Sequence, residues 1–478
     1  MHIVNKKAKI IATLGPASRS EKVIRELLAH GANVFRLNFS HGTHEDHKAS
    51  IDAIRAVAKK HNVFPAILAD LQGPKIRTGV TDGDKTITLK AGNKVVLTTE
   101  KKICTESEIC IDYQGILDDI TVGAEILIND GSIRLKVDAI DKKKKQAICA
   151  ILNTGVYSSH KGVNFPNVQL NVPSFTDKDK NDLAFILRHD IQYIAMSFVR
   201  KRSDILPLKA IVKQSGKSIK IIAKIEKPEA EQNLEDILDV CDGIMVARGD
   251  LGIETSPYIV PLLQKSMIAQ ANQKGKIVIV ATQMLESMIT CAMPTRAESS
   301  DVANAIIDGA DALMLSGETA MGAYPVGAVD TMAKIAEITE RSPYFSKGIV
   351  DPIFAVKTEA HALCKAAAWA SQNLNNIPIL VFTFSGETAF FLSKIRTQAQ
   401  VFAFSPSTHV VCQLALAWNT RGFLLPFNRS MVSMQQQAEL VLIEAKVVRK
   451  GDSVLVISGT TPVRGATNYV RVKKVGEE

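Results

Sequence analysis

Short β-rich runs alternate with amphipathic helical stretches eight times along this 478-residue chain. Each helical stretch carries apolar residues at helical spacing, and some are bounded by recognisable start and stop residues such as Gly31. The expected strands are residues 9–13, 33–39, 65–70, 191–198, 219–226, 242–247, 276–282 and 312–316. Eight strand–helix units predict a (β/α)8 TIM barrel, a fold that places reactive groups at the carboxyl ends of its strands.

Polar side chains stand at the ends of all eight expected strands. Lys224 and Glu226 lie two positions apart on one strand, so both should face the barrel mouth. Asp250 follows the next strand, and flanking glycines would let the backbone approach a ligand closely. Two carboxylates on neighbouring strand ends can hold Mg²⁺, and a lysine beside them can neutralise a transferring phosphoryl group. A purely structural Lys–Glu ion pair is the alternative, and the coincidence with Asp250 disfavours it.

The alternation is interrupted once, between about residues 74 and 173, where short strands and glycine turns replace the helical period. We expect a small β-barrel domain there, inserted at the catalytic face as a lid. After residue 342 a third unit begins, in which strands again alternate with helices. The predicted division is a barrel of residues 1–73 and 174–342, an inserted β lid domain of 74–173, and a C-terminal α/β regulatory domain of 343–478.

The composition fits an ordinary globular protein, with 46% hydrophobic and 22% charged residues. The seven cysteines are scattered and form no Cys-x-x-Cys pair, so neither a disulfide framework nor a zinc site is expected. No apolar run has the length of a membrane span, and the first residues lack the pattern of a signal peptide. We therefore expect a cytoplasmic protein without membrane or nucleic-acid partners, whose net charge of +9 suits anionic small-molecule substrates.

Six segments of the sequence resemble the signatures of the pyruvate kinase family, and the resemblance extends over essentially the whole chain. They are residues 35–42 (FRLNFSHG), 222–226 (IAKIE), 242–252 (DGIMVARGDLG), 281–288 (ATQMLESM), 294–298 (PTRAE) and 315–320 (LSGETA). The resemblance implies Mg²⁺-dependent phosphoryl transfer from phosphoenolpyruvate to ADP, giving pyruvate and ATP as the last step of glycolysis. It also implies that Mn²⁺ can substitute and that the protein is a homotetramer.

Carried over position by position, the resemblance assigns roles to individual residues. Lys224 would stabilise the phosphoryl group in flight and the enolate left behind, and Glu226 and Asp250 would bind Mg²⁺. The other implied contacts are Arg36 to the transferring phosphate, Gly249, Asp250 and Thr282 to the substrate carboxylate, and Asn38, Arg77 and Lys161 to the nucleotide. Thr282 and Ser316 would belong to a polar cluster that relays a proton to the enolate carbon.

The resemblance also implies a monovalent-cation site, formed by Asn38, Ser40, Asp70 and the backbone of Leu71. In K⁺-dependent members a Glu follows the Gly-Pro of the next motif and a Thr follows the Asp, but this chain has Lys75 and Leu71 there. A tethered ammonium can supply the charge of a free cation, so we expect little or no K⁺ requirement. Thr78 is retained as in K⁺-dependent members, which leaves some stimulation open.

A loop in the third unit contains Thr383, Ser385, Gly386 and Thr388 between an expected strand and helix, as in a phosphate site. Similar loops in pyruvate kinases hold a sugar-phosphate effector. Glu387 stands where activator-binding relatives often place a basic residue, which favours an effector with one phosphate, such as AMP or a sugar monophosphate. A turn without any ligand is the alternative.

Two other function classes share some of these features. A Mg²⁺-dependent barrel lyase could use the same Lys–Glu–Asp group, but it would not need an inserted lid and a phosphate-binding third domain. A non-catalytic sensor of sugar phosphates would be expected to have lost Lys224 or Asp250, and both are present.

Overall fold

The structure is a computed structural model that describes residues 5–347, 358–427, 430–459 and 467–477. Eight parallel strands close into a barrel in the order β1-β16-β15-β14-β13-β12-β3-β2, which confirms the expected fold. Their bounds are β1 (Lys9–Thr13), β2 (Val34–Asn38), β3 (Ala66–Asp70), β12 (Tyr193–Met196), β13 (Lys220–Ile225), β14 (Gly243–Ala247), β15 (Ile277–Ala281) and β16 (Ala312–Leu315). Seven of the eight strands are one to four residues shorter than expected, because six begin one or two residues later and the last residues of five have already turned into the loops of the mouth.

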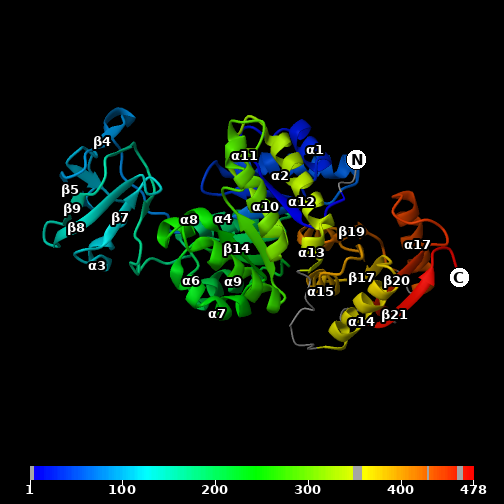
Figure 1. Ribbon diagram of the computed structural model, residues 1–478. Helices are drawn as coiled ribbons and strands as arrows, with labels where there is room; N and C mark the ends of the chain where they lie inside the picture. The colour runs from blue at the N-terminus through cyan, green and yellow to red at the C-terminus, as the bar shows by residue number, and fades with distance from the viewer. Residues whose placement is uncertain (1–4, 348–357, 428–429, 460–466, 478) are drawn as a thin grey trace.

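The helices cover the outside of the barrel (Figure 1). They are α1 (Glu21–Ala29), α2 (His44–His61), α4 (Asp177–Ile186), α5 (Arg202–Gln214), α6 (Pro228–Gln232), α7 (Leu234–Val240), α8 (Arg248–Glu254), α9 (Val260–Gln273), α10 (Arg296–Asp308), α11 (Gly317–Ala320) and α12 (Pro325–Arg341). A capping box begins α10, since Glu298 N donates to Thr295 Oγ1 and Thr295 N donates to Glu298 Oε2. In the described part of the chain, no helix combines the length and apolarity that a membrane span requires.

The barrel interior is a packed core and not a pore. Every residue of β1, β3, β14 and β15 is buried. Large side chains such as Ile11, Leu68, Tyr193, Ile222 and Met245 form one inward-facing cluster. Each fully buried Leu or Ile contributes about 1.5–3 kcal/mol of hydrophobic stabilisation. The rigid interior leaves chemistry to the strand ends.

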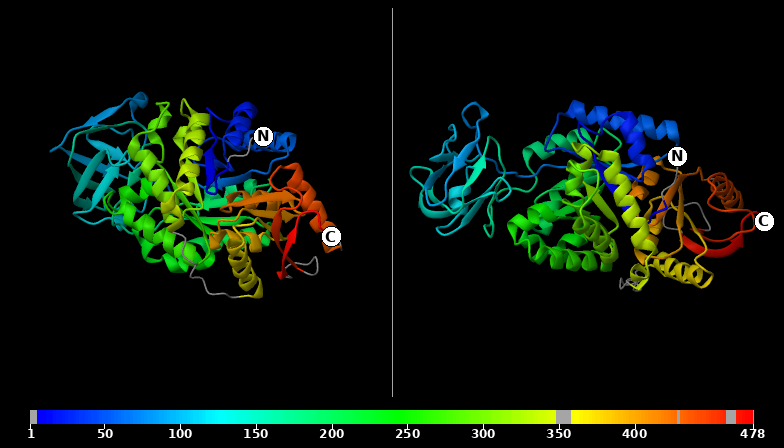
Figure 2. Two further views of the ribbon diagram at one scale, coloured as in Figure 1. Left: turned by 45° about the vertical axis from the view of Figure 1, so that its right-hand side comes forward. Right: turned by 45° about the horizontal axis from the view of Figure 1, so that its top comes forward.

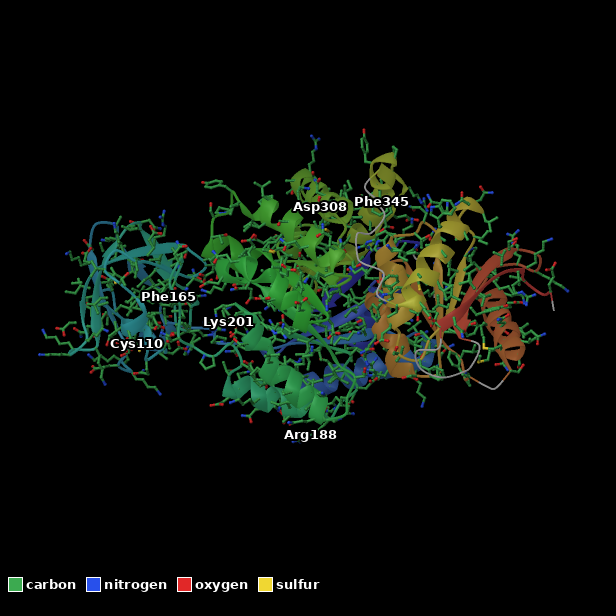
Figure 3. The ribbon with its side chains drawn as sticks, turned by 90° about the horizontal axis from the view of Figure 1, so that it is seen from below. Cys110, Phe165, Arg188, Lys201, Asp308 and Phe345 are labelled. Atoms are coloured by element: carbon green, nitrogen blue, oxygen red, sulfur yellow. The ribbon has the colours of Figure 1, made fainter. Side chains whose placement is uncertain are left out.

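The inserted segment forms its own β structure between β3 and α4. A six-stranded sheet has the order β11-β7-β8-β9-β5-β6, and a second sheet pairs β10 with β4. The strands are β4 (Ile87–Leu89), β5 (Lys94–Thr98), β6 (Glu108–Cys110), β7 (Glu125–Ile128), β8 (Ile133–Asp141), β9 (Gln146–Ile151), β10 (Gly155–Tyr157) and β11 (Val163–Asn164). Figure 3 shows this unit, marked by Cys110 and Phe165, beyond the barrel edge that carries Lys201. A separate apolar core stabilises it.

The third unit lies at the opposite end of the barrel from the inserted unit in every view (Figures 1 and 2). Its five-stranded sheet has the order β19-β18-β17-β20-β21, with only β21 antiparallel to its neighbour. The strands are β17 (Ile379–Phe382), β18 (Val401–Ser405), β19 (Thr420–Leu424), β20 (Ser453–Gly459) and β21 (Thr467–Lys474), and the longer helices are α14 (Glu359–Asn373), α15 (Glu387–Ile395) and α17 (Met431–Glu444). Trp418 of this unit packs on Phe345, which follows the last barrel helix. The barrel mouth is therefore free to face the inserted unit.

Candidate functional site

Lys224 is the centre of a buried polar network at the mouth of the barrel. Its ammonium lies 2.8 Å from Glu226 Oε1 and 3.4 Å from Asp70 Oδ1, and it donates to Ser197 Oγ at 2.8 Å. The side chain of Lys224 is only 13% exposed, while those of Asp70 and Glu226 are fully enclosed. The network joins the ends of three neighbouring strands, β3, β12 and β13.

Arg36 enters the same network from β2. Its Nε donates to Asp70 Oδ2 at 2.7 Å, and its Nη1 donates to Thr13 Oγ1 at 3.1 Å. Asp70 therefore joins the guanidinium of Arg36 to the ammonium of Lys224. Because a buried carboxylate between two cations holds both in place, the positive groups can meet an anion in a fixed arrangement.

The charges of this network shift the pKa values of its members. Burial opposes the charge on Lys224, but the carboxylates of Asp70 and Glu226 outweigh burial and raise its pKa. Burial also raises the pKa of Glu226, and the charge of Asp250 adds to that effect while Lys224 opposes it. Lys224 is consequently a permanent cation at neutral pH, as a group that neutralises phosphate should be.

The two carboxylates predicted to hold a metal lie on adjacent segments. Glu226 directly follows β13, and its Oε2 accepts a hydrogen bond from Phe198 N at 2.7 Å. As expected, Asp250 follows a strand that ends at Ala247, and the structure places it in the first turn of the short helix α8. Its half-buried side chain lines a cleft and is close enough to Glu226 to raise the pKa of that carboxyl.

This donor set fits magnesium. Mg²⁺ is usually held by one or two carboxylates together with water and substrate phosphates, and rarely by a full protein cage. In keeping with that rule, the described residues contain no group of three or more His, Cys, Asp or Glu side chains arranged to hold a metal. Glu226 and Asp250 could provide two hard oxygen ligands and would leave the other positions of a Mg²⁺ ion open.

Thr282 follows β15 and has an unusual backbone conformation. Its φ is +68°, a left-handed conformation that is rare for a β-branched residue. The next residue, Gln283, is also left-handed, with a φ of +55°. Thr282 Oγ1 accepts a hydrogen bond from Gly249 N at 2.8 Å, so the loops after β14 and β15 are joined directly. A Cβ added at Gly249 would lie 3.4 Å from this hydroxyl oxygen, in ordinary van der Waals contact.

Ser316 follows β16 and its hydroxyl is buried without a hydrogen-bond partner in the described structure. Its backbone N–H donates to Glu318 Oε2 at 2.7 Å, while Glu318 Oε1 accepts from Leu285 N at 3.1 Å. The fully buried Glu318 thus joins the loops that carry Ser316 and Thr282. A buried hydroxyl without a partner is uncommon, and it suits a group that meets substrate.

The residues predicted to face the nucleotide come from the inserted unit and from the barrel. Arg77 and Lys161 lie on adjoining segments of the inserted unit, where Arg77 Nη1 donates to His160 O and Lys161 N donates to Thr78 Oγ1. Asn38 lies at the end of β2, and its side-chain oxygen accepts from Ser40 N. A solvent-open cleft of about 590 Å³ runs between the inserted unit and the barrel, lined by Lys75, Gly162, Arg200, Lys227, Asp250 and Glu254 among others.

Several cations act on His41, which lies in the loop after β2. Partial burial lowers its pKa, and the charges of Arg77, Lys75 and Arg36 lower it further. These cations come from the inserted unit, from the segment that leads into it, and from β2. A region where several cations converge is suited to bind a phosphate group.

Two groups of the expected monovalent-cation site, the carboxylate of Asp70 and the carbonyl of Leu71, contact other side chains. Asp70 pairs with Arg36 and Lys224, and the carbonyl of Leu71 accepts a hydrogen bond from Ser197 Oγ at 2.7 Å. Lys75 is half-buried, and its Cε lies 3.6 Å from where a Cβ at Gly162 would be, so the side chain extends along the cleft.

The loop predicted to bind an effector begins directly after β17 and leads into α15. Thr383 Oγ1 accepts from Gly386 N, and Ser385 Oγ accepts from Glu387 N. Thr388 Oγ1 lies 3.2 Å from Thr467 Oγ1 of β21. Residues 460–466, which precede Thr467 in the sequence, lie outside the described residues.

Four residues of the mouth received no role from the sequence alone, although all of them follow or end a strand. Thr13 and Ser197 bind Arg36 and Lys224, respectively. Glu318 joins two loops, and Arg248 donates to the carbonyl of Thr282. Their polarity at strand ends was the available signal, but a partner across the barrel cannot be assigned without the register of the strands.

Comparisons with known proteins agree along the whole chain. The family model of the pyruvate kinase barrel domain matches residues 5–329, and that of the pyruvate kinase alpha/beta domain matches residues 361–473. A pyruvate kinase of Staphylococcus haemolyticus is 43% identical over 477 residues, which cover 99% of this chain and 81% of that protein. A pyruvate kinase of Staphylococcus aureus (strain MRSA252) is 42% identical over 476 residues, with the same coverage. The crystal structure of a pyruvate kinase from Cryptosporidium parvum superposes with a TM-score of 0.90 at 33% identity, covering 98% of this chain and 96% of that one.

Proposed function

The chain belongs to the pyruvate kinase family, and on that premise we propose that its barrel mouth transfers the phosphoryl group of phosphoenolpyruvate to ADP with the help of Mg²⁺. The observation that carries this proposal is the buried network in which Asp70 and Glu226 hold Lys224 and Arg36 at adjoining strand ends. Two fixed cations beside two potential metal ligands match the needs of a reaction whose substrates are all anionic.

The transfer breaks the bond between phosphorus and the enol oxygen and forms a bond to a terminal oxygen of ADP. Lys224 and Arg36 face the charge that is spread over the phosphoryl oxygens, and they need no rearrangement because Asp70 and Glu226 already orient them. When bound to Glu226 and Asp250, Mg²⁺ supplies further neutralisation of phosphate charge. Backbone amides near Gly249 and the hydroxyl of Thr282 would hold the substrate carboxylate.

The enolate left by the transfer must take up a proton at carbon to become pyruvate. We assign this relay to a polar cluster that includes Thr282 and Ser316. The buried hydroxyl of Ser316 has no hydrogen-bond partner in the described structure, and Glu318 fixes its backbone. The uptake of the proton makes the overall reaction strongly favourable.

The inserted unit would act as a lid over the nucleotide. Arg77 and Lys161 belong to it, and Asn38 lies at the end of β2 on the barrel side. Closure would bring these groups together around the phosphates and exclude water from the transfer. The cleft between the two units is the space that closure would narrow.

We further propose the domain boundaries stated above: a barrel of residues 1–73 and 174–342, a lid of 74–173 and a regulatory unit of 343–478. Support comes from the insertion of β4 to β11 between barrel strands β3 and β12.

A place in glycolysis, a cytoplasmic location and a homotetramer are proposed from the family. Size-exclusion chromatography with light scattering tests the tetramer.

A coupled assay tests the function directly. Purified protein is supplied with phosphoenolpyruvate, ADP and MgCl₂, and pyruvate is followed through NADH oxidation by lactate dehydrogenase while ATP is measured separately. We expect equal amounts of both products and no product without a divalent metal. Pyruvate without ATP would indicate a phosphatase or lyase, and the absence of both would contradict the proposal.

A further inference from the structure

Arg248 follows β14 directly, and its side chain reaches across to the loop that follows β15. Its Nη2 donates to Thr282 O at 2.7 Å and to Gln283 O at 3.3 Å, and it lies 2.9 Å from the sulfur of Met284. Its Nε also donates to Thr282 O, at 3.3 Å. One guanidinium therefore contacts three consecutive residues of this loop.

These contacts fall on a segment with a strained backbone. Thr282 and Gln283 both have positive φ, at +68° and +55°, and neither residue is glycine. Backbone conformations of this kind persist only where the surroundings impose them, and they gather at functional sites. Arg248 is the side chain that holds the carbonyls of both residues.

The guanidinium is itself anchored on the side away from the loop. Its Nη1 donates to Asp301 Oδ1 at 2.6 Å and lies 3.5 Å from Gln264 Oε1. The arginine side chain is only 11% exposed. Because a planar guanidinium presents its donors in a fixed fork, the anchor on Asp301 determines where the donors to Thr282 point.

We propose that Arg248 is a positioning residue that keeps Thr282 in its left-handed conformation. It thereby fixes Thr282 Oγ1, which donates to Ala281 O at 2.6 Å, at the place where the substrate carboxylate is proposed to bind. This inference deepens the proposed function and rests on it. Arg248 touches no reacting atom in this arrangement and acts through Thr282, whose Oγ1 also accepts from Gly249 N. A lysine at this position could pair with Asp301 but could not contact all the loop acceptors together.

Arg248→Lys tests the proposal, and a second substitution distinguishes positioning from general stability. We expect kcat to fall about 10- to 100-fold in Arg248→Lys, since a displacement of about 1 Å can cost that much. The KM for ADP should stay unchanged, because the nucleotide contacts lie elsewhere. Gln283→Gly, at an exposed position, lets the loop adopt positive φ without strain and should restore kcat of the Arg248→Lys variant at least about fivefold.

Arg55 provides a matched control at the opposite end of the barrel. It also holds backbone carbonyls with its guanidinium, donating to Pro65 O and Asp190 O. Arg55→Lys should lower the melting temperature without lowering kcat. Adding Gln283→Gly to Arg55→Lys should raise neither its melting temperature nor its kcat. If Arg248→Lys fails to fold, Asp301→Asn replaces it, because this substitution weakens the anchor of the Arg248 guanidinium. We expect Asp301→Asn to lower kcat as well.

Hydrogen–deuterium exchange gives a readout that does not need activity. The amides of residues 282–285 should exchange faster in Arg248→Lys than in the unaltered protein. This comparison uses the single variant alone, without Gln283→Gly. If the unaltered protein lacks phosphoryl transfer, the proposed function fails and exchange alone decides the role of Arg248. Unchanged exchange, a kcat within twofold of the unaltered protein, or no recovery with Gln283→Gly would each overturn the proposal.

Discussion

Lys224 Nζ lies 2.8 Å from Glu226 Oε1, and the two side chains come from positions separated by a single residue at the end of β13. The pair is enclosed, and Asp70 approaches the same ammonium from β3 at 3.4 Å. An isolated buried ion pair adds little to stability, because desolvation offsets much of the attraction. Burying Lys224, Glu226 and Asp70 together costs free energy, so we infer that they serve to bind an anionic ligand and a metal, not to stabilise the fold.

Glu226→Gln and Asp250→Asn should nearly abolish turnover while the protein stays folded. Each substitution removes one carboxylate charge from the pair proposed to hold Mg²⁺, and loss of such a ligand costs several kcal/mol, or about a thousandfold in rate. The coupled assay and thermal melting, run side by side, measure the two effects. Glu340→Gln is the control, since Glu340 is buried near the N-terminus, where it accepts from the backbone of Lys7 and Ala8. Near-normal activity in either site variant would remove the metal assignment.

Lys224→Met should still bind phosphoenolpyruvate but lose about 3 kcal/mol of transition-state stabilisation, roughly a hundredfold in kcat. The reason is that the ammonium acts on charge that moves during the transfer, and the ground state has other cations nearby. Lys473→Met is the matched control, because Lys473 of β21 is also buried and pairs with Glu439 at 2.7 Å in the third unit, away from the barrel mouth. A rise in the KM for phosphoenolpyruvate with kcat unchanged would make Lys224 a binding residue instead.

The barrel and the two carboxylates could be predicted from the sequence because both depend on local patterns. Strand–helix alternation gives the fold, and a period of two puts Lys224 and Glu226 on one face. The link from Arg36 through Asp70 to Lys224 could not be predicted from residues alone, because it depends on which strands are neighbours in the closed barrel. The family resemblance implied a monovalent-cation site at Asp70 but did not predict that this carboxylate pairs with Arg36 and Lys224.

Asp250 illustrates a different limit of sequence analysis. Its position after the strand 242–247 was predicted, but the sequence did not predict that α8 begins immediately after Ala247 and carries Asp250 in its first turn. Strand ends and short helices have similar composition when glycines are present, so periodicity cannot separate them over a few residues. The positive φ of Thr282, and with it the role of Arg248, likewise has no signature in the sequence.

An activator with one phosphate group should act through Ser385 and Thr388. The loop leads into α15, and Glu387 in its first turn disfavours a second phosphate. Titration calorimetry with AMP, ribose 5-phosphate, glucose 6-phosphate and fructose 1,6-bisphosphate should show binding of a monophosphate that Ser385→Ala weakens. Ser393→Ala, a buried serine further along α15, is the control. Tight binding of the bisphosphate alone would contradict this expectation.

Lys394 should make the stability of the protein rise with pH above about 8. Burial lowers the pKa of Lys394 to about 8, with Asp311 opposing and Arg396 adding to that shift. The unfolded chain keeps this proton up to the ordinary lysine value of 10.5, so unfolding takes up a proton between the two values. Raising the pH through this window therefore favours the folded state, by on the order of 3 kcal/mol.

Lys394→Met isolates this effect. Urea unfolding of the unaltered protein and the variant between pH 7.5 and about 10.5 should show the unaltered protein gaining stability relative to the variant. Lys334→Met, which removes an exposed lysine paired with Asp330, should follow the unaltered protein. If the difference in unfolding free energy between the unaltered protein and Lys394→Met stayed constant from pH 7.5 to about 10.5, the pKa of Lys394 would not be lowered in the folded state.

The enzyme should need little or no K⁺. Lys75 occupies the position of the Glu found in K⁺-dependent relatives, and its ammonium lies with Arg36 and Arg77 in the positive field that lowers the pKa of His41. A free cation beside these charges would be repelled, and the carbonyl of Leu71 already accepts from Ser197. Activity should therefore be measurable in tetramethylammonium buffer, with little gain when KCl is titrated at constant ionic strength. Lys75→Glu should acquire K⁺ dependence, whereas Lys85→Glu, at an exposed position of the inserted unit, should not. An unaltered enzyme that is inactive until K⁺ is added would show that Lys75 does not replace the ion.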